Sequence, residues 1–397
     1  MERLTLRATI IHRSFKPKGG AERVALNTIE ALQEMGFKIT LVSEWRPEFR
    51  DFKNLWDIDI KVSKVKSVFS PFMELSNWPI HLQPLPTLLT LPLCSIQKAD
   101  LVINTVAEIC LPYFRLTLPY FSLYGSPLIS YIHIDLGDPL CSMKEYPSKY
   151  RKSALWRLYF TSYRVLFGCT LDYFDRYTVS KSLILTNSEF TKRAIQSRYP
   201  EVEPIIVSPP VDIETFTRVL KSDNREDRVL AIARISPEKQ LENVIELAKL
   251  LPKHIKCTIV GSYKRAHEHY YEKLMELIKR YKLEERVEIK TYNLKALLEL
   301  MGRSKVYFHT MSGEAFGITI VESMAAGLIP IVPDYGGQTE FVPRKYHYHT
   351  LANAAEIVER YINAPQSERV TINRIARLFS KAKFKSKIKM IVNSVIS

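Results

Sequence analysis

The sequence predicts an α/β protein built from two doubly wound, Rossmann-like domains that face each other across a cleft. Its 397 residues, of which 46% are hydrophobic, are enough to bury two ordinary cores. Short apolar runs of strand length alternate with amphipathic helical patterns along much of the chain. The Pro209-Pro210 pair interrupts this alternation near the middle. We therefore expect domains over residues 1–208 and 209–379, and a last helix over 380–397.

The N-terminal half opens with a strand, a glycine turn and a helix. Residues 8–12 have the pattern of a buried strand, and Gly19 and Gly20 form the turn that follows. The apolar face of the next helix contains Val24, Ala25, Ile29 and Leu32. Two glycines before a helix let ligand oxygens approach backbone amides, although a plain tight turn explains the pair equally well. No Gly-Lys-Ser/Thr follows, which excludes a Walker loop.

A second strand of this half, over residues 128–132, ends in His133, Ile134 and Asp135. The carboxyl ends of parallel strands are where ligands bind in such sheets. His133 is therefore a candidate ligand contact, with a structural histidine as the alternative. Asp135 is expected to form a turn, or otherwise to orient His133 or deprotonate a hydroxyl group.

The second half alternates strands and helices more regularly. We expect strands and helices in turn over residues 229–233, 241–251, 257–260, 271–281, 287–289, 294–301, 306–309, 318–326 and 329–332. After the first of these strands come Arg234 and Lys239, two cations at a carboxyl strand end. Arginine supplies a fork and lysine a point charge for phosphate oxygens. A surface helical turn with ordinary charges is the alternative.

The stretch from Met311 to Gly327 contains two carboxylates around a glycine turn that opens a helix. Gly313 and Gly317 let the backbone approach a ligand, and the free amides at the start of the helix suit a diphosphate. Glu314 comes from the loop and Glu322 from the helix, at different heights along such a ligand. Both carboxylates can accept hydrogen bonds from vicinal hydroxyl groups, one pair on a hexose and one on a ribose.

Seven residues separate Glu314 from Glu322, and with their flanking motifs they resemble the signature of glycosyltransferase family 4. The resemblance implies a GT-B fold, retention of anomeric configuration, and a last helix that returns to the first domain. It assigns the diphosphate to Arg234 and Lys239, the ribose to Glu322, and sugar contacts to His133. It assigns the donor sugar to Glu314 and the loop and helix start after it. This loop and helix start consist of Ala315, Phe316, Gly317, Ile318 and Thr319. The family also has a Gly-Gly loop at the place of Gly19-Gly20, which makes these two glycines candidate donor-binding residues.

Segments around Ser130–His133, 186–191, 207–216 and 309–314 look most like one branch of that family. This branch is the dolichol-linked-oligosaccharide α-1,2-mannosyltransferases, which use GDP-mannose at the cytosolic face of a membrane. The branch carries His-Tyr-Pro at His133-Ile134-Asp135, and an N-terminal membrane anchor that this chain lacks. The resemblance implies mannose first and glucose second, from GDP-mannose or a UDP-hexose, with a glycan or polyprenyl-linked acceptor. No metal or other cofactor is expected.

The formal net charge of +15 calls for an anionic partner or a surface explanation. Nucleic acid is disfavoured because no recognition motif accompanies the charge. Residues 144–167 interleave cations with aromatic residues, which favours peripheral contact with an anionic membrane, or else the packed face of a helix. Five scattered cysteines and the lack of a signal sequence fit the cytoplasm. A nucleotide-sugar epimerase or hydrolase, and a noncatalytic membrane scaffold, are the alternative functions.

Overall fold

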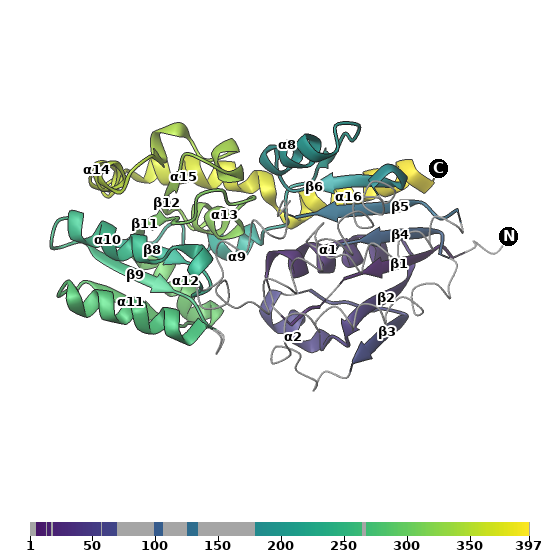
Figure 1. The fold of residues 1–397 in the computed structure, drawn as a ribbon, viewed down its shortest axis with the longest axis horizontal. Helices are drawn as coiled ribbons and strands as arrows, with labels where there is room; N and C mark the ends of the chain where they lie inside the picture. The colour runs from purple at the N-terminus through teal and green to yellow at the C-terminus, as the bar shows by residue number, and fades with distance from the viewer. Residues whose placement is uncertain are drawn as a thin grey trace, which may run out of the picture. The chain divides into compact units, whose positions relative to one another are not determined.

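The computed structural model divides the chain into two compact units (Figure 1). It describes residues 5–12, 14–16, 19–56, 58–69, 99–105, 125–133, 179–263 and 267–396. Unit 1 comprises Met1–Pro210 and Ala382–Ser397, and unit 2 comprises Val211–Lys381. The boundary predicted after residue 208 thus lies after Pro210, and the one predicted after residue 379 lies after Lys381.

Unit 1 is built on a parallel sheet in which the described strands have the order β3-β2-β1-β4-β5-β6-β7. The strands are β1 (Arg7–Ile11), β2 (Lys38–Trp45), β3 (Lys64–Phe69), β4 (Leu101–Asn104), β5 (Leu128–Ile132), β6 (Ser182–Thr186) and β7 (Ile205–Ile206). The order reverses at β1, where Ala8 lies between Ile39 of β2 and Leu101 of β4. Such a switch point leaves a crevice at the carboxyl ends of the strands.

Helices cover both faces of this sheet. Those in the described part of the chain are α1 (Gly20–Glu34), α2 (Phe49–Trp56), α8 (Glu189–Arg198) and α16 (Lys381–Ile396). Successive residues of β5 alternate between faces, so Tyr131 joins the core beneath α1 and α16, whereas Ile132 packs with Ile195 of α8. The apolar face predicted for α1 is buried, which confirms that prediction.

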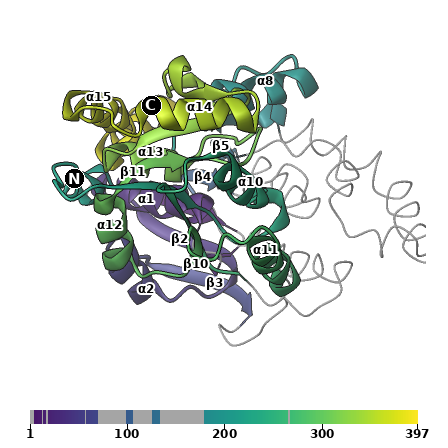
Figure 2. The same ribbon diagram turned by 90° about the vertical axis from the view of Figure 1, so that its left-hand side faces the viewer.

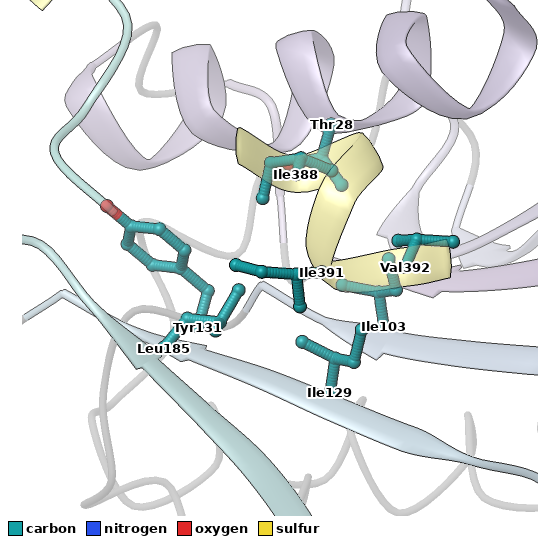
Figure 3. A pocket seen from close by; sticks show the side chains of 8 residues that line it. All are labelled: Thr28, Ile103, Ile129, Tyr131, Leu185, Ile388, Ile391 and Val392. Atoms are coloured by element: carbon teal, nitrogen blue, oxygen red, sulfur yellow. The ribbon is translucent and has the colours of Figure 1, made fainter. Parts of the chain in front are cut away.

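The last helix closes the unit 1 core with the apolar residues Ile388, Ile391 and Val392 (Figure 3). They face five side chains from α1 and the sheet, namely Thr28, Ile103, Ile129, Tyr131 and Leu185. The gap among these eight residues is too small to hold a water molecule. Lys385 of α16 also lies 3.1 Å from a carboxylate oxygen of Glu30 on α1. This seam is therefore packed core, with no room for a ligand.

Unit 2 contains a second parallel sheet, with the described strands in the order β10-β9-β8-β11-β12-β13. They are β8 (Glu226–Ile232), β9 (Lys256–Val260), β10 (Val287–Lys290), β11 (Ser304–Phe308), β12 (Ile329–Pro333) and β13 (His347–Tyr348). Its α-helices are α9 (Ile213–Thr217), α10 (Glu242–Leu250), α11 (Glu268–Arg280), α12 (Leu294–Arg303), α13 (Ile318–Ala325), α14 (Leu351–Tyr361) and α15 (Gln366–Ala376). Figure 2 shows α11 and α12 on opposite faces. The order reverses between β8 and β11, so both strands deliver their carboxyl ends to one switch point.

The strand expected over residues 229–233 begins earlier than predicted, as β8. β8 begins at Glu226 because the buried Arg228 is neutralised inside the sheet. Its guanidinium donates to Glu226 Oε2 at 3.0 Å and to Glu288 Oε1 of β10 at 2.8 Å. Because its charge is paired, Arg228 is tolerated in β8 before the apolar run that begins at Val229.

Two short elements lie near the boundary between the units. Residues 213–217 form α9, and Asp212 caps this helix by accepting from the backbone N–H of Thr215 at 3.4 Å. The two-residue strand β7 pairs with β6, its single partner among the described strands. Short edge strands of this kind are common at the borders of sheets.

Several sequence predictions fall beyond the described residues. The basic aromatic segment 144–167 and Asp135 lie outside them. Within the described ranges, no helix is both long and apolar enough to span a bilayer. In the same ranges, no three His, Cys, Asp or Glu side chains converge as metal ligands would. Cys257 is a buried free thiol.

Candidate functional site

The predicted strand-loop-helix-strand around Glu314 is present in unit 2 as β11, a glycine loop, α13 and β12. Gly317 is the N-cap of α13, with a left-handed backbone at φ 92°, and a Cβ there would lie 2.5 Å from Ile320 Cδ1. Only glycine fits this turn without strain. No side chain caps α13, so the first amides of the helix remain available to a ligand.

The loop before α13 is fixed by a second glycine loop that follows β12. The backbone N–H of Gly337 donates to the Glu314 carbonyl at 2.7 Å, and that of Gly313 donates to the Tyr335 carbonyl at 2.8 Å. A Cβ on Gly336 would lie 2.8 Å from the Glu314 carbonyl oxygen. Gly336 was missed by the sequence analysis, although its Gly-Gly pair directly after a buried strand was a visible signal.

Two of the predicted site residues meet directly. Lys239 Nζ lies 2.8 Å from Glu314 Oε2, and each side chain is only 18% exposed. Lys239 ends a short 3₁₀ helix, Pro237–Lys239, that follows β8, and Glu314 follows β11. Because β8 and β11 are neighbours in the sheet, the two turns share one edge. Met311 completes this contact, with its sulfur 3.2 Å from Lys239 Nζ.

His309, which the sequence analysis did not select, lies at the same carboxylate. Its Nε2 atom is 3.6 Å from Glu314 Oε2, and its Nδ1 atom is 3.3 Å from the hydroxyl of Tyr307. Burial alone would raise the pKa of Glu314, but His309 and Lys239 outweigh it and hold that pKa well below its ordinary value. Glu314 is therefore an anion at neutral pH. The signal for His309 was its position as the first residue after β11.

The helix α13 supplies the second carboxylate. Glu322 is buried, with 3% of its surface exposed. Burial raises the pKa of Tyr307, and the charges of Glu314 and Glu322 raise it further, so both carboxylates act on one phenol. The Tyr307 hydroxyl is also 2.9 Å from Thr319 Oγ1 in the first turn of α13. Loop, strand and helix thus form one connected polar group.

The remaining predicted residues of unit 2 have different environments. Phe316 turns into the core against Phe341 and Phe379, so only its backbone is offered to a ligand. Ala315 is buried, and Ile318 packs on the same core. Arg234 follows β8 with a side chain 66% exposed, and it lies 3.5 Å from Glu238 instead of at the Lys239–Glu314 pair. A long exposed arginine beside the switch point is able to reach an incoming anion.

In unit 1, the Gly19-Gly20 turn is held by Glu22, another residue that the sequence analysis missed. Glu22 Oε2 accepts from the Gly19 N–H at 2.6 Å, and Oε1 lies 3.7 Å from His12 Nε2. Burial of His133, and to a smaller extent the neighbouring His12, lower the pKa of His133 to about 3. Its imidazole is therefore neutral near pH 7, with Nε2 buried and lacking a hydrogen-bond partner among the described residues.

Two family models match the chain in succession. The model of Glycosyltransferase Family 4 matches residues 18–215, and that of Glycosyl transferases group 1 matches residues 212–377. The chain belongs to glycosyltransferase family 4. The resemblance seen in the Glu314 and Glu322 motif is thereby confirmed, and the family membership covers both units.

Curated relatives of this family 4 chain include mannosyltransferases. A GDP-Man:Man(3)GlcNAc(2)-PP-Dol alpha-1,2-mannosyltransferase of Caenorhabditis elegans is 26% identical over 63% of this chain and 57% of its own length. An Alpha-1,3/1,6-mannosyltransferase ALG2 of Dictyostelium discoideum is 24% identical, with 92% of each chain covered. The chain thus spans less than two thirds of the first of these relatives.

Solved structures similar to this family 4 chain establish its fold. HepE of Anabaena in complex with UDP superposes with a TM-score of 0.71 at 17% identity, covering 98% of this chain and 100% of HepE. The sucrose-phosphate synthase of Thermosynechococcus elongatus gives 0.72 at 14% identity, covering 98% of each chain. The GT-B fold expected from the sequence is confirmed.

Proposed function

We propose that the protein is a retaining glycosyltransferase that moves mannose from GDP-mannose to a hydroxyl group of a lipid-linked oligosaccharide. The Lys239–Glu314 pair carries this proposal, because it joins a cation suited to phosphate and a carboxylate suited to sugar hydroxyls at 2.8 Å. Relatives named for GDP-Man and PP-Dol acceptors support the choice of substrates. A UDP-hexose, with glucose as the sugar, is the second choice.

The donor is held by charges and backbone amides at the carboxyl edge of the unit 2 sheet. Lys239 and Arg234 bind the diphosphate together with the free amides at the start of α13. Glu314 accepts hydrogen bonds from hydroxyls of the hexose, and Glu322 does so from the ribose. In unit 1, the neutral imidazole of His133 and the amides of Gly19 and Gly20 are our candidate substrate contacts.

The reaction follows from this charge distribution. The bond from the anomeric carbon to the diphosphate oxygen breaks, and a bond from that carbon to the acceptor oxygen forms on the same face. The acceptor's proton passes to the leaving phosphate oxygen. Arg234 and Lys239 stabilise the charge that develops on the diphosphate, so no divalent metal is required. Family 4 membership supports retention, and no covalent intermediate is invoked.

A donor screen with product analysis tests the proposal. The unfolding temperature of the purified protein is measured with GDP, with UDP and without nucleotide. Fresh protein is then incubated with GDP-mannose or UDP-glucose, with and without a polyprenyl-linked Man(3)GlcNAc(2) acceptor, the kind for which the relatives are named. We expect GDP to raise the unfolding temperature and a mannosylated acceptor to appear by mass spectrometry, with the Lys239→Ala variant inactive. An epimerase or hydrolase consumes the donor without any acceptor. A noncatalytic scaffold shows no shift with either nucleotide; each of these results rejects the proposal.

We also propose peripheral binding to an anionic membrane surface, where a lipid-linked acceptor is found. The net charge of +15 supports it. The outer face of α16 adds exposed Lys383, Lys387 and Met390, the last of which is 63% exposed. Vesicles containing phosphatidylserine are expected to carry the protein upward in a flotation gradient at low salt. Absence from those vesicles, with the protein still folded, contradicts this part of the proposal.

A further inference from the structure

Two basic side chains share one oxygen of Glu314. Lys239 Nζ lies 2.8 Å from Oε2, and His309 Nε2 lies 3.6 Å from the same atom. Among the described residues, no third basic side chain has its nitrogen within 4 Å of this carboxylate. The lysine contact is a hydrogen bond, whereas the histidine contact is longer than one. Lys239 is thus hydrogen-bonded to Glu314, and His309 lies next to the same oxygen without a hydrogen bond to it.

His309 is built into its position from several sides. Its backbone N–H donates to the Ile331 carbonyl at 2.9 Å, and its own carbonyl accepts from the Tyr348 hydroxyl at 2.9 Å. The Tyr307 hydroxyl lies 3.3 Å from Nδ1 and orients the ring. This hydroxyl is itself 2.9 Å from Thr319 Oγ1. When Tyr307 donates to Nδ1, the neutral imidazole carries its proton on Nε2, the atom that faces Glu314.

That Nε2 atom is buried and has no hydrogen-bond partner in the described part of the chain, and the whole side chain is only 6% exposed. Buried polar atoms are rarely left in this state, and each such atom calls for an explanation. His309 Nε2 faces the Glu314 carboxylate, which already accepts a hydrogen bond from Lys239. This placement is explained if Lys239 leaves the carboxylate during the catalytic cycle.

The proposed function requires Lys239 to leave. A diphosphate at the start of α13 competes with Glu314 for the lysine, and a buried carboxylate that loses its only hydrogen-bonded cation is strongly destabilised. We propose that His309 replaces Lys239 as the hydrogen-bond donor to Glu314 when the donor diphosphate binds the lysine. His309 is then a positioning residue, which keeps Glu314 ionised and oriented toward the sugar hydroxyls. This inference rests on the proposed function.

Unit 2 contains a matched control for this group. His254 Nε2 also lies 3.6 Å from a carboxylate oxygen, that of Asp227, and Lys305 Nζ is 2.5 Å from the other oxygen. This second group also places a lysine and a histidine at one carboxylate, here an aspartate instead of a glutamate, but the His254 side chain is 64% exposed and Asp227 lies near the amino end of β8. His254→Leu and His254→Gln therefore control for the substitutions themselves.

Calorimetric titration with GDP, or with UDP if the wild type binds only UDP, tests the exchange. We expect His309→Leu to weaken nucleotide binding about tenfold, the effect of losing one buried hydrogen bond to a charged group. His309→Gln, whose amide nitrogen can replace Nε2, is expected to stay within about threefold of the wild type. Equal losses in both variants indicate a merely structural role and overturn the proposal, as does a wild-type affinity in His309→Leu.

A thermal-unfolding cycle without nucleotide separates this inference from the proposed function. His309→Leu is expected to change the unfolding temperature little while Lys239 is present, and to lower it by several degrees in a Lys239→Met background, where the histidine is the remaining partner of Glu314. If the effects of His309→Leu and Lys239→Met on the unfolding temperature are additive, the proposed replacement of Lys239 by His309 is wrong, even if the protein transfers sugar. If no nucleotide binds but the Lys239 and His309 substitutions remain nonadditive, the proposed function is rejected. Glu314 is then still shown to have two alternative partners, Lys239 and His309.

Discussion

The backbone N–H of Gly19 donates a 2.6 Å hydrogen bond to Glu22, so the first turn of α1 holds the glycine turn that precedes it. The other carboxylate oxygen of Glu22 lies 3.7 Å from His12 Nε2, directly after β1. His12 Nδ1 is in turn 3.0 Å from Thr105 Oγ1, directly after β4. Glu22 therefore connects the turn to the ends of two adjacent strands, and these residues occupy the switch point of unit 1.

Removal of the Glu22 carboxylate should loosen this turn. We expect Glu22→Ala to lower the free energy of unfolding by about 1–2 kcal/mol, as for the loss of a helix cap, and to reduce turnover as well. Glu22→Gln keeps an acceptor for Gly19 and should retain most of the stability. Urea denaturation and a donor-turnover assay measure both effects. The exposed Glu201→Ala is the control, and an equal change in that variant contradicts the assignment.

His133 should make the stability of unit 1 depend on pH. Burial and His12 lower its pKa from 6.5 to about 3, so the folded state keeps it neutral while the unfolded state binds a proton below about pH 6.5. Its contribution to stability is therefore intact above that pH and is lost as the pH falls toward 3. We expect wild type to lose up to about 1.4 kcal/mol per pH unit relative to His133→Gln.

Urea unfolding of both proteins from about pH 8 to about pH 5 measures this difference. A His254→Gln variant is the control, because that exposed histidine has a 64% accessible side chain. Parallel stability curves for wild type and His133→Gln through this range mean that the folded and unfolded states bind this proton equally, and they contradict a lowered pKa for His133 in the folded protein.

The sequence predicts much of the fold and part of the site. It does not predict contacts that depend on the order of the strands in the sheet. Buried runs around residues 306–309 and 329–332 predict β11 and β12 because parallel strands with both faces covered are apolar throughout. The Lys239–Glu314 contact joins residues 75 positions apart. It depends on β8 lying beside β11, which no local pattern specifies. His309 was missed for the same reason, since Ile331 and Tyr348, which fix its backbone, belong to other strands. Glu22 is different, because its contact with Gly19 spans only three residues and was open to prediction from the local pattern.

Gly336 should be intolerant of any side chain. A Cβ there would lie 2.8 Å and 2.9 Å from the Glu314 carbonyl oxygen and amide nitrogen, in addition to the strain of φ 131°. Gly36→Ala is a matched control, because Gly36 also has a positive φ, 84°, but has open space around its Cβ position. We expect Gly336→Ala to be destabilised by at least about 1 kcal/mol more than Gly36→Ala, and to bind nucleotide more weakly.

Denaturant unfolding and nucleotide titration of the two alanine variants check this prediction. The difference between them contains the clash with Glu314 together with the extra backbone strain of φ 131° over φ 84°, and the nucleotide titration isolates the effect on Glu314. If Gly336→Ala and Gly36→Ala lose the same stability and Gly336→Ala binds nucleotide like the wild type, the loop after β12 does not hold Glu314.

Arg234 should affect the chemical step more than the fold. Its side chain is 66% exposed and its ion pair with Glu238 is a surface contact, so Arg234→Ala should change the free energy of unfolding by less than about 0.5 kcal/mol. If the guanidinium stabilises the charge that develops on the leaving diphosphate, the same variant should lower kcat by about a hundredfold. Arg234→Lys keeps the charge but not the fork, and should recover only part of the rate. Steady-state kinetics with the accepted donor measure this effect, and the exposed Arg280→Ala is the control. If Arg234→Ala lowers stability without lowering kcat, Arg234 has a structural role. If only KM rises, Arg234 contacts the substrate equally in the ground state and the transition state.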